Sequence, residues 1–355
     1  MINLIKKKII KLIIKNQVDR PIKIKKRNNI NLNIRTKFLI NSFGKKNPNK
    51  FFYVIKVDKK GGGGLFSNVL FILNHLKISR KHNFIPVIDM ENFPTRYNES
   101  KKIFKSLNSW EYYFEPISRI SLHEVYLSKN VIFTDGFFNE DMSINFLANK
   151  TLKPIFEKYI KIKKQYLDNI NKFAKKNFEK HKVLAVHFRG TSMKTIPKHP
   201  LPPPYYQIKR LIDKAIKKYK FDKIFLVTDQ LDYLNLLKKD YGKMLCYRNS
   251  YRSNKAKIFD LKPRRLHRYN MGVDALEDTL LMSKLNYLIC SRSNMSQVAS
   301  LMLRKNMNVL EIRNGCNPNK IFFSQFNWII KKNIPEFMGG FKRKLDLKFT
   351  KRQST

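Results

Sequence analysis

Apolar runs of strand length alternate with helically spaced apolar residues in the first half of the chain. Residues 51–57 (Phe-Phe-Tyr-Val-Ile-Lys-Val) have the composition of a strand, and residues 65–81 repeat leucine, valine and isoleucine at helical spacing. Further short strands are predicted at residues 84–88 and 131–134. Because strand, glycine-rich loop, helix and strand follow one another, we expect a parallel sheet with crossover helices.

The second half repeats this alternation over a longer stretch. Helical, lysine-rich sequence over residues 151–180 leads into a series of strand–helix units. Strands are predicted at residues 183–187, 223–228, 244–247, 287–290 and 308–312. The helices are predicted at residues 205–219, 231–240, 273–284 and 295–305. The pattern therefore predicts an α/β protein in which two Rossmann-like lobes with parallel sheets face each other across a cleft.

A chain of 355 residues exceeds the usual size of a single core, so more than one domain is expected. Residues 51–180 are predicted to form the first lobe and residues 181–335 the second. Residues 1–50 are assigned to a basic N-terminal tail and linker, and residues 336–355 to a basic C-terminal tail.

The charge of the chain is extreme: 73 Lys and Arg stand against 26 Asp and Glu, which gives a formal net charge of +47. Such a charge is typical of proteins with a polyanionic partner, namely nucleic acid, an anionic membrane or an anionic glycan. Lysine recurs along the whole chain, however, and no zinc spacing, RNP-type strand or basic heptad region is present. We therefore expect a solvated basic surface and no nucleic-acid partner, and keep a basic nucleic-acid-binding protein as an alternative.

Cysteine usage and the N-terminus bear on the compartment. Cys246, Cys290 and Cys316 are widely spaced and form neither a metal set nor a disulfide framework, which favours a reducing, cytoplasmic location. No run reaches the roughly 18 apolar residues of a membrane span. Residues 1–15 place isoleucine and leucine near helical spacing between lysines, as in helices that lie on anionic membranes. Peripheral contact with the inner face of the membrane is therefore one hypothesis, and a frayed basic tail is the other.

Residues 183–192 carry the strongest chemical signal. An apolar strand ends in His187, Arg189 and Gly190, and a proline-rich loop follows. Ligands of open α/β sheets bind outside the carboxyl ends of the strands, and a guanidinium group forks onto phosphate oxygens. Arg189 is predicted to hold a diphosphate, and an arginine paired with a carboxylate at a strand end is the alternative.

Four glycines at positions 61–64 separate the first predicted strand from its helix. Such a loop allows backbone amides and the helix N-terminus to approach an anion or a sugar, and a tight turn explains it equally well. A P-loop would end in Gly-Lys-Ser/Thr, whereas Leu65 follows here, which argues against ATPases and kinases. The expected contact residues of this loop are Gly62, Gly63, Gly64 and Asn68.

Other polar groups follow the predicted strands of the second lobe. Thr228 and Asp229 end a buried strand, and helix capping by Asp229 is the favoured interpretation; a role near the ligand requires this strand to adjoin the one ending at Arg189. The turn at 291–296 (Ser-Arg-Ser-Asn-Met-Ser) can cap a helix and leave amides free for phosphate. The basic loop at 264–268 suits a diphosphate or is simply solvated.

The order of these motifs along the chain resembles the order of motifs in one protein family. The order is His187-x-Arg189-Gly190-Thr191, Thr228-Asp229, Gly272-Val-Asp274-Ala-Leu-Glu-Asp278, and Leu288-Ile-Cys-Ser291-Arg-Ser293-Asn294. It is similar to the order in the fucosyltransferase superfamily of α1,2-, α1,6- and protein O-fucosyltransferases, GT-B enzymes that use GDP-fucose. The α1,6 type is nearest, because His199-Pro200 matches the His-Pro dipeptide that follows its motif.

The resemblance implies a GT-B fold with an acceptor-side first lobe and a second lobe that binds the nucleotide sugar. It places Arg189 on the donor diphosphate with support from His187, and Asp278 on the guanine or ribose side. The donor-binding residues that it implies are His187, Arg189, Gly190, Asp229, Asp278, Ser293 and Asn294.

The chain departs from the α1,6 pattern where a general base is expected. That pattern continues with Thr-Asp-Lys and a further acidic residue, whereas Thr191-Ser-Met-Lys follows here and no carboxylate stands between Arg189 and Asp213. His199 has a suitable intrinsic pKa and is the candidate base, although a structural role for this histidine is the favoured interpretation. The alternatives in the first lobe are Asp89, Glu91 and Asp135.

The predicted reaction is an inverting, metal-independent transfer of fucose from GDP-fucose, or of the sugar of another GDP-sugar, to a glycan hydroxyl in polysaccharide biosynthesis. No Asp-x-Asp metal-ligand pair stands at a strand end, and Arg189 with the polar turn near Ser293 can stabilise the leaving diphosphate. No cofactor is expected besides the GDP-sugar co-substrate. A catalytically inactive module that binds a nucleotide or a glycan is the remaining alternative.

Overall fold

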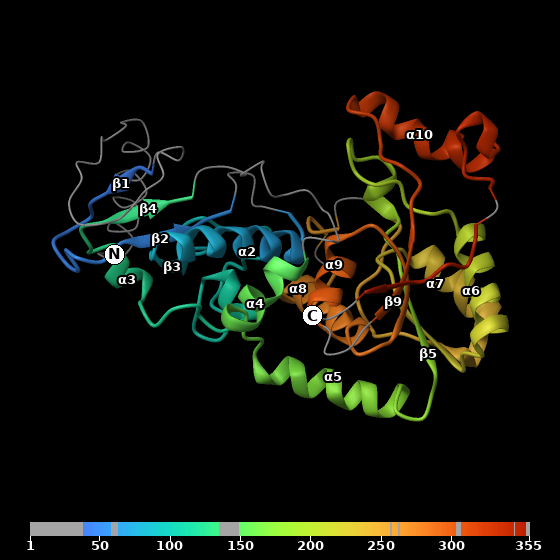
Figure 1. Cartoon of the computed structure of the whole chain (residues 1–355), viewed down its shortest axis with the longest axis horizontal. Coiled ribbons are helices and arrows are strands. Elements are labelled where there is room, and N and C mark those ends of the chain that lie inside the picture. Colours follow the sequence, from blue (N-terminus) through green and yellow to red (C-terminus); the bar gives the residue numbers. More distant parts are fainter. Residues whose placement is uncertain are drawn as a thin grey trace. The chain divides into compact units, whose positions relative to one another are not determined.

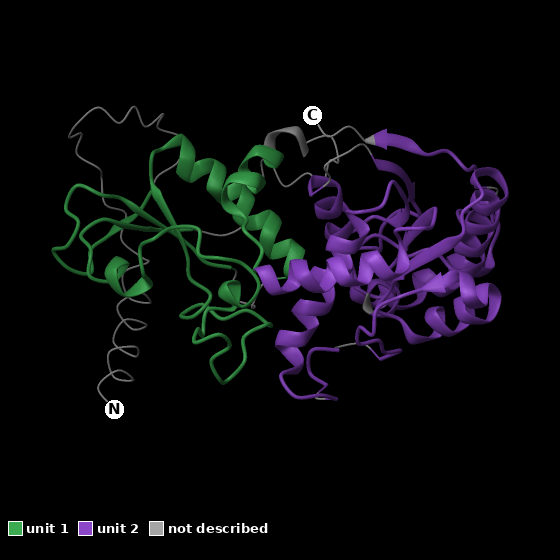
Figure 2. Ribbon diagram, turned by 90° about the horizontal axis from the view of Figure 1, so that it is seen from below, with its two compact units in different colours: residues 1–163 green, residues 164–355 purple. Residues whose placement is uncertain are grey.

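The computed structural model describes residues 38–57, 63–134, 149–255, 258–261, 263–302, 307–343 and 345–352. The chain divides into two compact units, residues 1–163 and residues 164–355 (Figure 2). Each unit contains one mainly parallel sheet, which confirms the predicted α/β class. The amphipathic segment at 1–15, Gly62 and Asp135 lie outside the described residues.

The sheet of the first unit has the strand order β1-β4-β2-β3. Strands β2 (Phe52–Ile55), β3 (Ile85–Ile88) and β4 (Val131–Phe133) are parallel, and helix α2 (Leu65–Lys81) connects β2 to β3. Strand β1 (Ile40–Asn41) pairs with β4 in the antiparallel sense, so the predicted linker up to residue 50 contains part of this sheet. The unit also contains η1 (Ser109–Tyr112), α3 (Leu122–Val125) and α4 (Asn149–Tyr159).

The sheet of the second unit has the order β10-β9-β8-β5-β6-β7. Its five parallel strands are β5 (Val183–His187), β6 (Lys223–Val227), β7 (Leu245–Cys246), β8 (Tyr287–Ser291) and β9 (Met307–Ile312). Counted in chain order from β5, these strands lie in the order 3-2-1-4-5, which is that of Rossmann sheets. The strand order therefore reverses between β5 and β8.

Helices cover both faces of this second sheet. Figure 1 shows α6 (Tyr205–Tyr219) and α7 (Leu231–Tyr241) on one side, and α8 (His267–Met282) and α9 (Asn294–Leu301) on the other. Helix α6 has the predicted bounds because its buried side chains recur at helical spacing and Pro204 at its N-cap fixes the entering backbone. Helix α5 (Lys164–Asn177) packs against α8 and belongs to this unit, so the predicted single helical bridge at 151–180 is divided between α4 and α5.

The last residues of the chain correct one prediction. Residues 336–355 were expected to form a basic tail, but β10 (Thr350–Arg352) pairs with β9 in the antiparallel sense. The Phe349 ring packs edge-on against Tyr219 and Tyr287, with centroids 5.5 and 5.3 Å away. Residues 345–352 are therefore part of the second unit. Among the described helices, none combines the length and apolarity that a bilayer-spanning segment requires.

Candidate functional site

The carboxyl ends of β5 and β8 bring together two of the predicted motifs. These strands are neighbours, with His187 paired to Cys290, and the strand order reverses between them. In open α/β sheets this reversal point is where ligands bind. Arg189 and Gly190 follow β5, while Ser293 and Asn294 follow β8 and begin α9. The Oγ atom of Ser293 lies 3.4 Å from Nδ1 of His187, which joins the two strand ends.

Asp229 anchors the loop that carries Arg189. Its carboxylate accepts hydrogen bonds from the backbone N–H of Gly190 at 3.0 Å, from Nε of Arg189 at 3.4 Å and from Oγ1 of Thr191 at 3.3 Å. Helix α7 has Gln230 at its N-cap with no side-chain cap, so the favoured interpretation of Asp229 as a helix cap is wrong. Strand β6 does adjoin β5, which was the condition for placing Asp229 near a ligand.

Arg189 forms the ion pair with a carboxylate that the alternative prediction described, but only through Nε. Its two terminal amino groups have no hydrogen-bond partner among the described residues, and its side chain is 35% exposed. A guanidinium held at Nε keeps the two parallel N–H donors that fork onto phosphate oxygens. The ion pair with Asp229 therefore orients Arg189 and leaves its two terminal amino groups available to a ligand.

His187 is buried beneath this arginine, with 1% of its surface exposed. Burial, followed by the positive charge of Arg189, lowers the pKa of the imidazole to about 4. The ring is neutral near pH 7 and adds no charge to the site. Ser293 also caps α9, because its Oγ accepts the backbone N–H of Ser296 at 3.2 Å. His187 and Ser293 therefore fix the ends of two strands relative to each other.

The depressed pKa of His187 has a consequence for stability. Between the ordinary pKa near 6.5 and the folded value of about 4, the unfolded chain binds a proton that the folded protein does not. Stability is therefore lost as the pH falls through this window, by up to about 3 kcal/mol for this residue. We expect His187→Asn to lose less free energy of unfolding than the parent between about pH 7 and pH 4. Urea titrations of both proteins measure this difference, and parallel pH profiles would contradict it.

The predicted base, His199, lies in the loop that follows Arg189. Its side chain is exposed, and its pKa is lowered by partial desolvation of the ring and then by the positive charge of Arg189. The loop is fastened to the segment after β9, because Asn317 donates its backbone N–H to the carbonyl of His199 at 2.9 Å. The side-chain amide of Asn317 also donates to the carbonyls of Met193 and Ile196 at 3.0 Å. No sequence motif pointed to Asn317.

Lys194 is a further cation in this loop that the motif analysis did not select. Its Nζ lies 4.4 Å from the ring centre of Trp328 and 5.3 Å from that of Tyr233. Burial lowers the pKa of Lys194, and the charge of Lys332 acts in the same direction, while Asp232 and Asp229 oppose the shift. The site therefore has a second positive group whose position is set by two aromatic rings.

Asp278, expected on the guanine or ribose side of the donor, has internal partners for both carboxylate oxygens. Oδ1 accepts from Arg248 at 3.1 Å and Oδ2 from the hydroxyl of Ser250 at 2.9 Å. Burial raises the pKa of Asp278 and the charge of Arg248 opposes this. Arg248 also pairs with Glu277. Direct contact of Asp278 with a donor stays a prediction, and in the structure it holds the segment after β7.

The basic loop at 264–268 is not simply solvated. Arg264 forms an ion pair with Asp274 of α8 at 2.5 Å, and the same carboxylate accepts the backbone N–H of Tyr251 at 3.0 Å. The segment after β7 in turn reaches the site, because Ser253 donates its backbone N–H to the carbonyl of Asp229 at 3.0 Å. Asp274 of α8 thus holds the segment after β7, which in turn contacts Asp229 through Ser253.

In the first unit, the glycine-rich loop is held by its own neighbours. Asn68 accepts the backbone N–H of Gly63 at 3.1 Å, and the Tyr97 hydroxyl accepts that of Leu65 at 2.7 Å. Gly64 is the N-cap of α2. The amide of Gly63, which a ligand was expected to use, is therefore already satisfied within the protein, and so is the amide of Leu65 at the start of α2.

Asp89 does not face an acceptor, which corrects one of the alternatives for the general base. It is fully buried and accepts hydrogen bonds from the backbone of Glu91 and Asn92 and from the Tyr126 hydroxyl. Burial raises its pKa, which these bonds oppose. Asp89 therefore organises the turn after β3.

Gly190 is required by close packing and not by an unusual backbone angle. A β-carbon at this position would lie 2.7 Å from Cδ and 2.9 Å from Cβ of the buried Gln230. We expect Gly190→Ala to lower the free energy of unfolding by about 1–3 kcal/mol through overpacking. Thermal and urea unfolding measure the loss, and Gly190→Ala combined with Gln230→Gly, which also removes the Cβ atom of residue 230, should recover most of it. No recovery in the double variant, judged against Gln230→Gly alone, would contradict this explanation.

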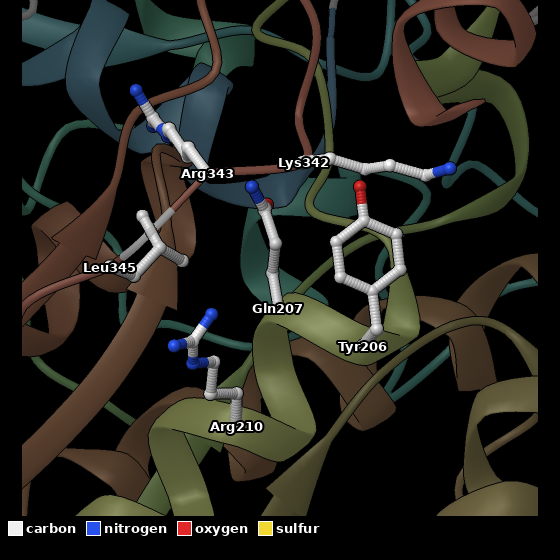
Figure 3. Close-up of a pocket in the computed structure, with 6 residues that line it drawn as sticks. All are labelled: Tyr206, Gln207, Arg210, Lys342, Arg343 and Leu345. Atoms are coloured by element: carbon white, nitrogen blue, oxygen red, sulfur yellow. The ribbon is translucent and has the colours of Figure 1, made fainter. Parts of the chain in front are cut away.

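A cavity of about 410 Å³ lies elsewhere in the second unit and contains none of the predicted site residues. It is lined by Tyr206, Gln207, Arg210, Lys342, Arg343 and Leu345 (Figure 3). The candidate site at the ends of β5, β6 and β8 is therefore separate from this cavity.

The strand order and the position of the site define the second unit as a Rossmann-type α/β fold. No family model matches the chain, and neither does any curated protein. Among solved structures, the chain is similar to NodZ α1,6-fucosyltransferase co-crystallized with GDP, at 17% identity and a TM-score of 0.49, covering 76% of this chain and 97% of that one. It is also similar to fucosyltransferase NodZ from Bradyrhizobium, at 16% identity and a TM-score of 0.46, covering 73% and 95%. The chain is also similar to a mutant of FUT1 of Arabidopsis thaliana in complex with GDP, at 12% identity and a TM-score of 0.43, covering 78% of this chain and 74% of that one.

Proposed function

We propose that this protein is a glycosyltransferase that transfers fucose from GDP-fucose to a glycan hydroxyl. The observation that carries the proposal is the guanidinium of Arg189, held through Nε at the reversal point of the second sheet with two donors left over. The order of the motifs, from His187 to Asn294, supports a fucosyltransferase-like donor over other nucleotide sugars. In this proposal the second unit binds the donor and the first unit the acceptor.

The difficult part of the reaction is the departure of a nucleoside diphosphate, whose negative charge grows as the bond to the sugar breaks. The terminal N–H groups of Arg189 and the N-terminus of α9, which begins at Asn294, supply positive potential at that point. One preorganised donor of this kind contributes about 3–4 kcal/mol in the transition state. We propose that these groups stabilise the diphosphate without a metal ion.

We propose His199 as the general base. Its lowered pKa keeps the imidazole neutral near pH 7, so it can accept the proton of the acceptor hydroxyl. The acceptor oxygen then bonds to the anomeric carbon on the face opposite the departing diphosphate, which inverts the configuration. General-base assistance contributes roughly 10²–10⁴-fold to the rate.

The class of donor is tested by thermal unfolding with a panel of nucleoside diphosphates. We expect GDP to stabilise the protein selectively, by about 2.7 kcal/mol at a concentration 100 times its dissociation constant. Release of GDP from GDP-fucose, with and without glycan acceptors, then tests turnover. Stabilisation by UDP or ADP to the same extent would contradict the donor assignment, and GDP binding without turnover would favour the inactive binding module.

A cytoplasmic location with peripheral membrane contact through residues 1–15 is also kept as a proposal. It rests on cysteine usage and on the spacing of lysine and isoleucine in that segment. Fractionation of cells that express the chain with and without residues 1–15 tests it. An unchanged, wholly soluble distribution of both proteins would contradict membrane contact by this segment.

A further inference from the structure

Helix α10 (Ile321–Asn333) and the following turn η5 (Glu336–Met338) expose an unusual amount of apolar surface. Figure 1 shows this helix at the periphery of the second unit. Six side chains of α10 are 50–66% exposed, and Phe337 is 87% exposed. We call this surface the apolar ridge, and it consists of Ile321, Phe322, Phe323, Phe326, Ile329, Ile330, Phe337 and Met338.

The apolar ridge is the outer side of a helix that is firmly attached by its inner side. Trp328 is buried, donates its indole N–H to the carbonyl of Pro202 at 2.7 Å and packs in a small core with Leu201 and Phe341. Ser324, also buried, donates to the carbonyl of Pro318 at 2.9 Å. Because Trp328 and Ser324 attach the inner face of α10 to the rest of the second unit, the exposed apolar residues belong to a helix whose position is fixed. The ring of Phe322 contacts those of Phe323 and Phe326, with centroids 5.7 Å apart in each pair, and soluble proteins rarely leave a contiguous apolar patch uncovered without a binding role.

Positive charge borders the apolar ridge. The sequence of α10 contains no acidic residue, and its last turn carries Lys331 and Lys332, while Glu336 of η5 is the one carboxylate in residues 321–338. The cavity of Figure 3 adjoins this end of the helix, because the Tyr206 hydroxyl donates to the carbonyl of Lys332 at 3.1 Å. Its lining contains three cationic residues and no carboxylate: Arg210, Lys342 and Arg343.

We infer that the apolar ridge inserts into the surface of a bilayer rich in anionic lipids. Phenylalanine and isoleucine at this density match the apolar face of helices that lie in the interface, and the neighbouring cations match lipid phosphates. A second copy of this chain fits less well, because each copy carries a formal net charge of +47 and would repel the other. The inference concerns a surface apart from Arg189 and does not depend on the proposed reaction.

Vesicle flotation with the full chain tests the inference. Binding is expected to vesicles of phosphatidylcholine with phosphatidylglycerol and to be much weaker with phosphatidylcholine alone. The combined variant Phe322→Ser, Phe323→Ser, Phe326→Ser should weaken binding at least about ten-fold, because three exposed apolar side chains are lost. The matched control, Leu167→Ser with Leu236→Ser, removes exposed leucines from α5 and α7 and should bind like the parent. Equal binding by the triple variant and the parent would overturn the inference.

The basic N-terminal segment could itself attract anionic vesicles, so insertion is measured at α10 directly. An environment-sensitive dye is placed at Phe326→Cys in a Cys316→Ser background, where Cys246 and Cys290 are buried. Emission should shift to the blue when anionic vesicles are added. Flotation without this shift would assign binding to residues 1–15 and overturn the inference. Self-association of the parent that the triple variant abolishes would identify a second copy as the occupant and also overturn it.

Discussion

Replacement of Arg189 by alanine is expected to lower kcat for fucose transfer by about 10²–10³-fold while the protein stays folded. The two terminal amino groups of this side chain are the donors proposed to hold the leaving diphosphate, and they form no hydrogen bond with the residues that the structure describes. Asp229 keeps its bonds to Gly190 and Thr191 after the replacement. Release of GDP from GDP-fucose in the presence of acceptor measures the loss, and thermal unfolding checks the fold.

The variant Arg189→Lys separates the geometry of the guanidinium group from its charge. It keeps a positive charge but cannot present two parallel donors, so most of the loss in kcat should remain. Arg313→Ala is the matched control, because Arg313 follows β9 at the same edge of the sheet and its side chain is 77% exposed. Its turnover should equal that of the parent. Normal turnover by Arg189→Ala would exclude this residue from the chemistry and remove the main support for the proposed function.

The second sheet was predictable because its strands are buried on both faces. Strand β5 and helix α6 have the predicted bounds, since continuous apolar runs and helical spacing leave little choice of element. Strands β1 and β10 are two and three residues long, lie at sheet edges and show no periodicity. Helix α10 was not predicted for a different reason. Apolar residues lie on both its buried and its exposed sides, so the sequence lacks the contrast between an apolar and a polar face on which helix prediction depends.

The candidate site was predicted as a set of motifs but not as a geometry. Strand ends are visible in the sequence, whereas the adjacency of β5 to both β6 and β8 follows from the order of the sheet. Asp229 was assigned to its own helix for this reason, although its partners Arg189 and Gly190 come from the neighbouring strand. Arg248 and Asn317 meet partners 30 and 124 residues away, and neither stands in a recognisable motif.

Arg248→Met is expected to destabilise the second unit by about 3–5 kcal/mol at neutral pH, because it removes the cation that forms ion pairs with two buried carboxylates. Arg248 pairs with Glu277 and Asp278, and the three side chains are 15%, 5% and 7% exposed. Urea unfolding of variant and parent measures the loss. Arg313→Met, which disrupts a pair whose arginine is largely in solvent, should change stability by less than about 1 kcal/mol.

The pH dependence of this loss identifies its cause. Burial already raises the pKa of Glu277 and of Asp278, and in both cases the charge of Arg248 opposes the rise. Without Arg248 both pKa values rise further, so the folded variant binds protons that the unfolded chain releases, and its stability increases as the pH falls through the raised values. The difference from the parent should therefore shrink between about pH 7 and pH 4, near the ordinary carboxyl pKa. A difference that stays constant over this range would mean that Arg248 stabilises the unit by packing and not by pairing with the two carboxylates.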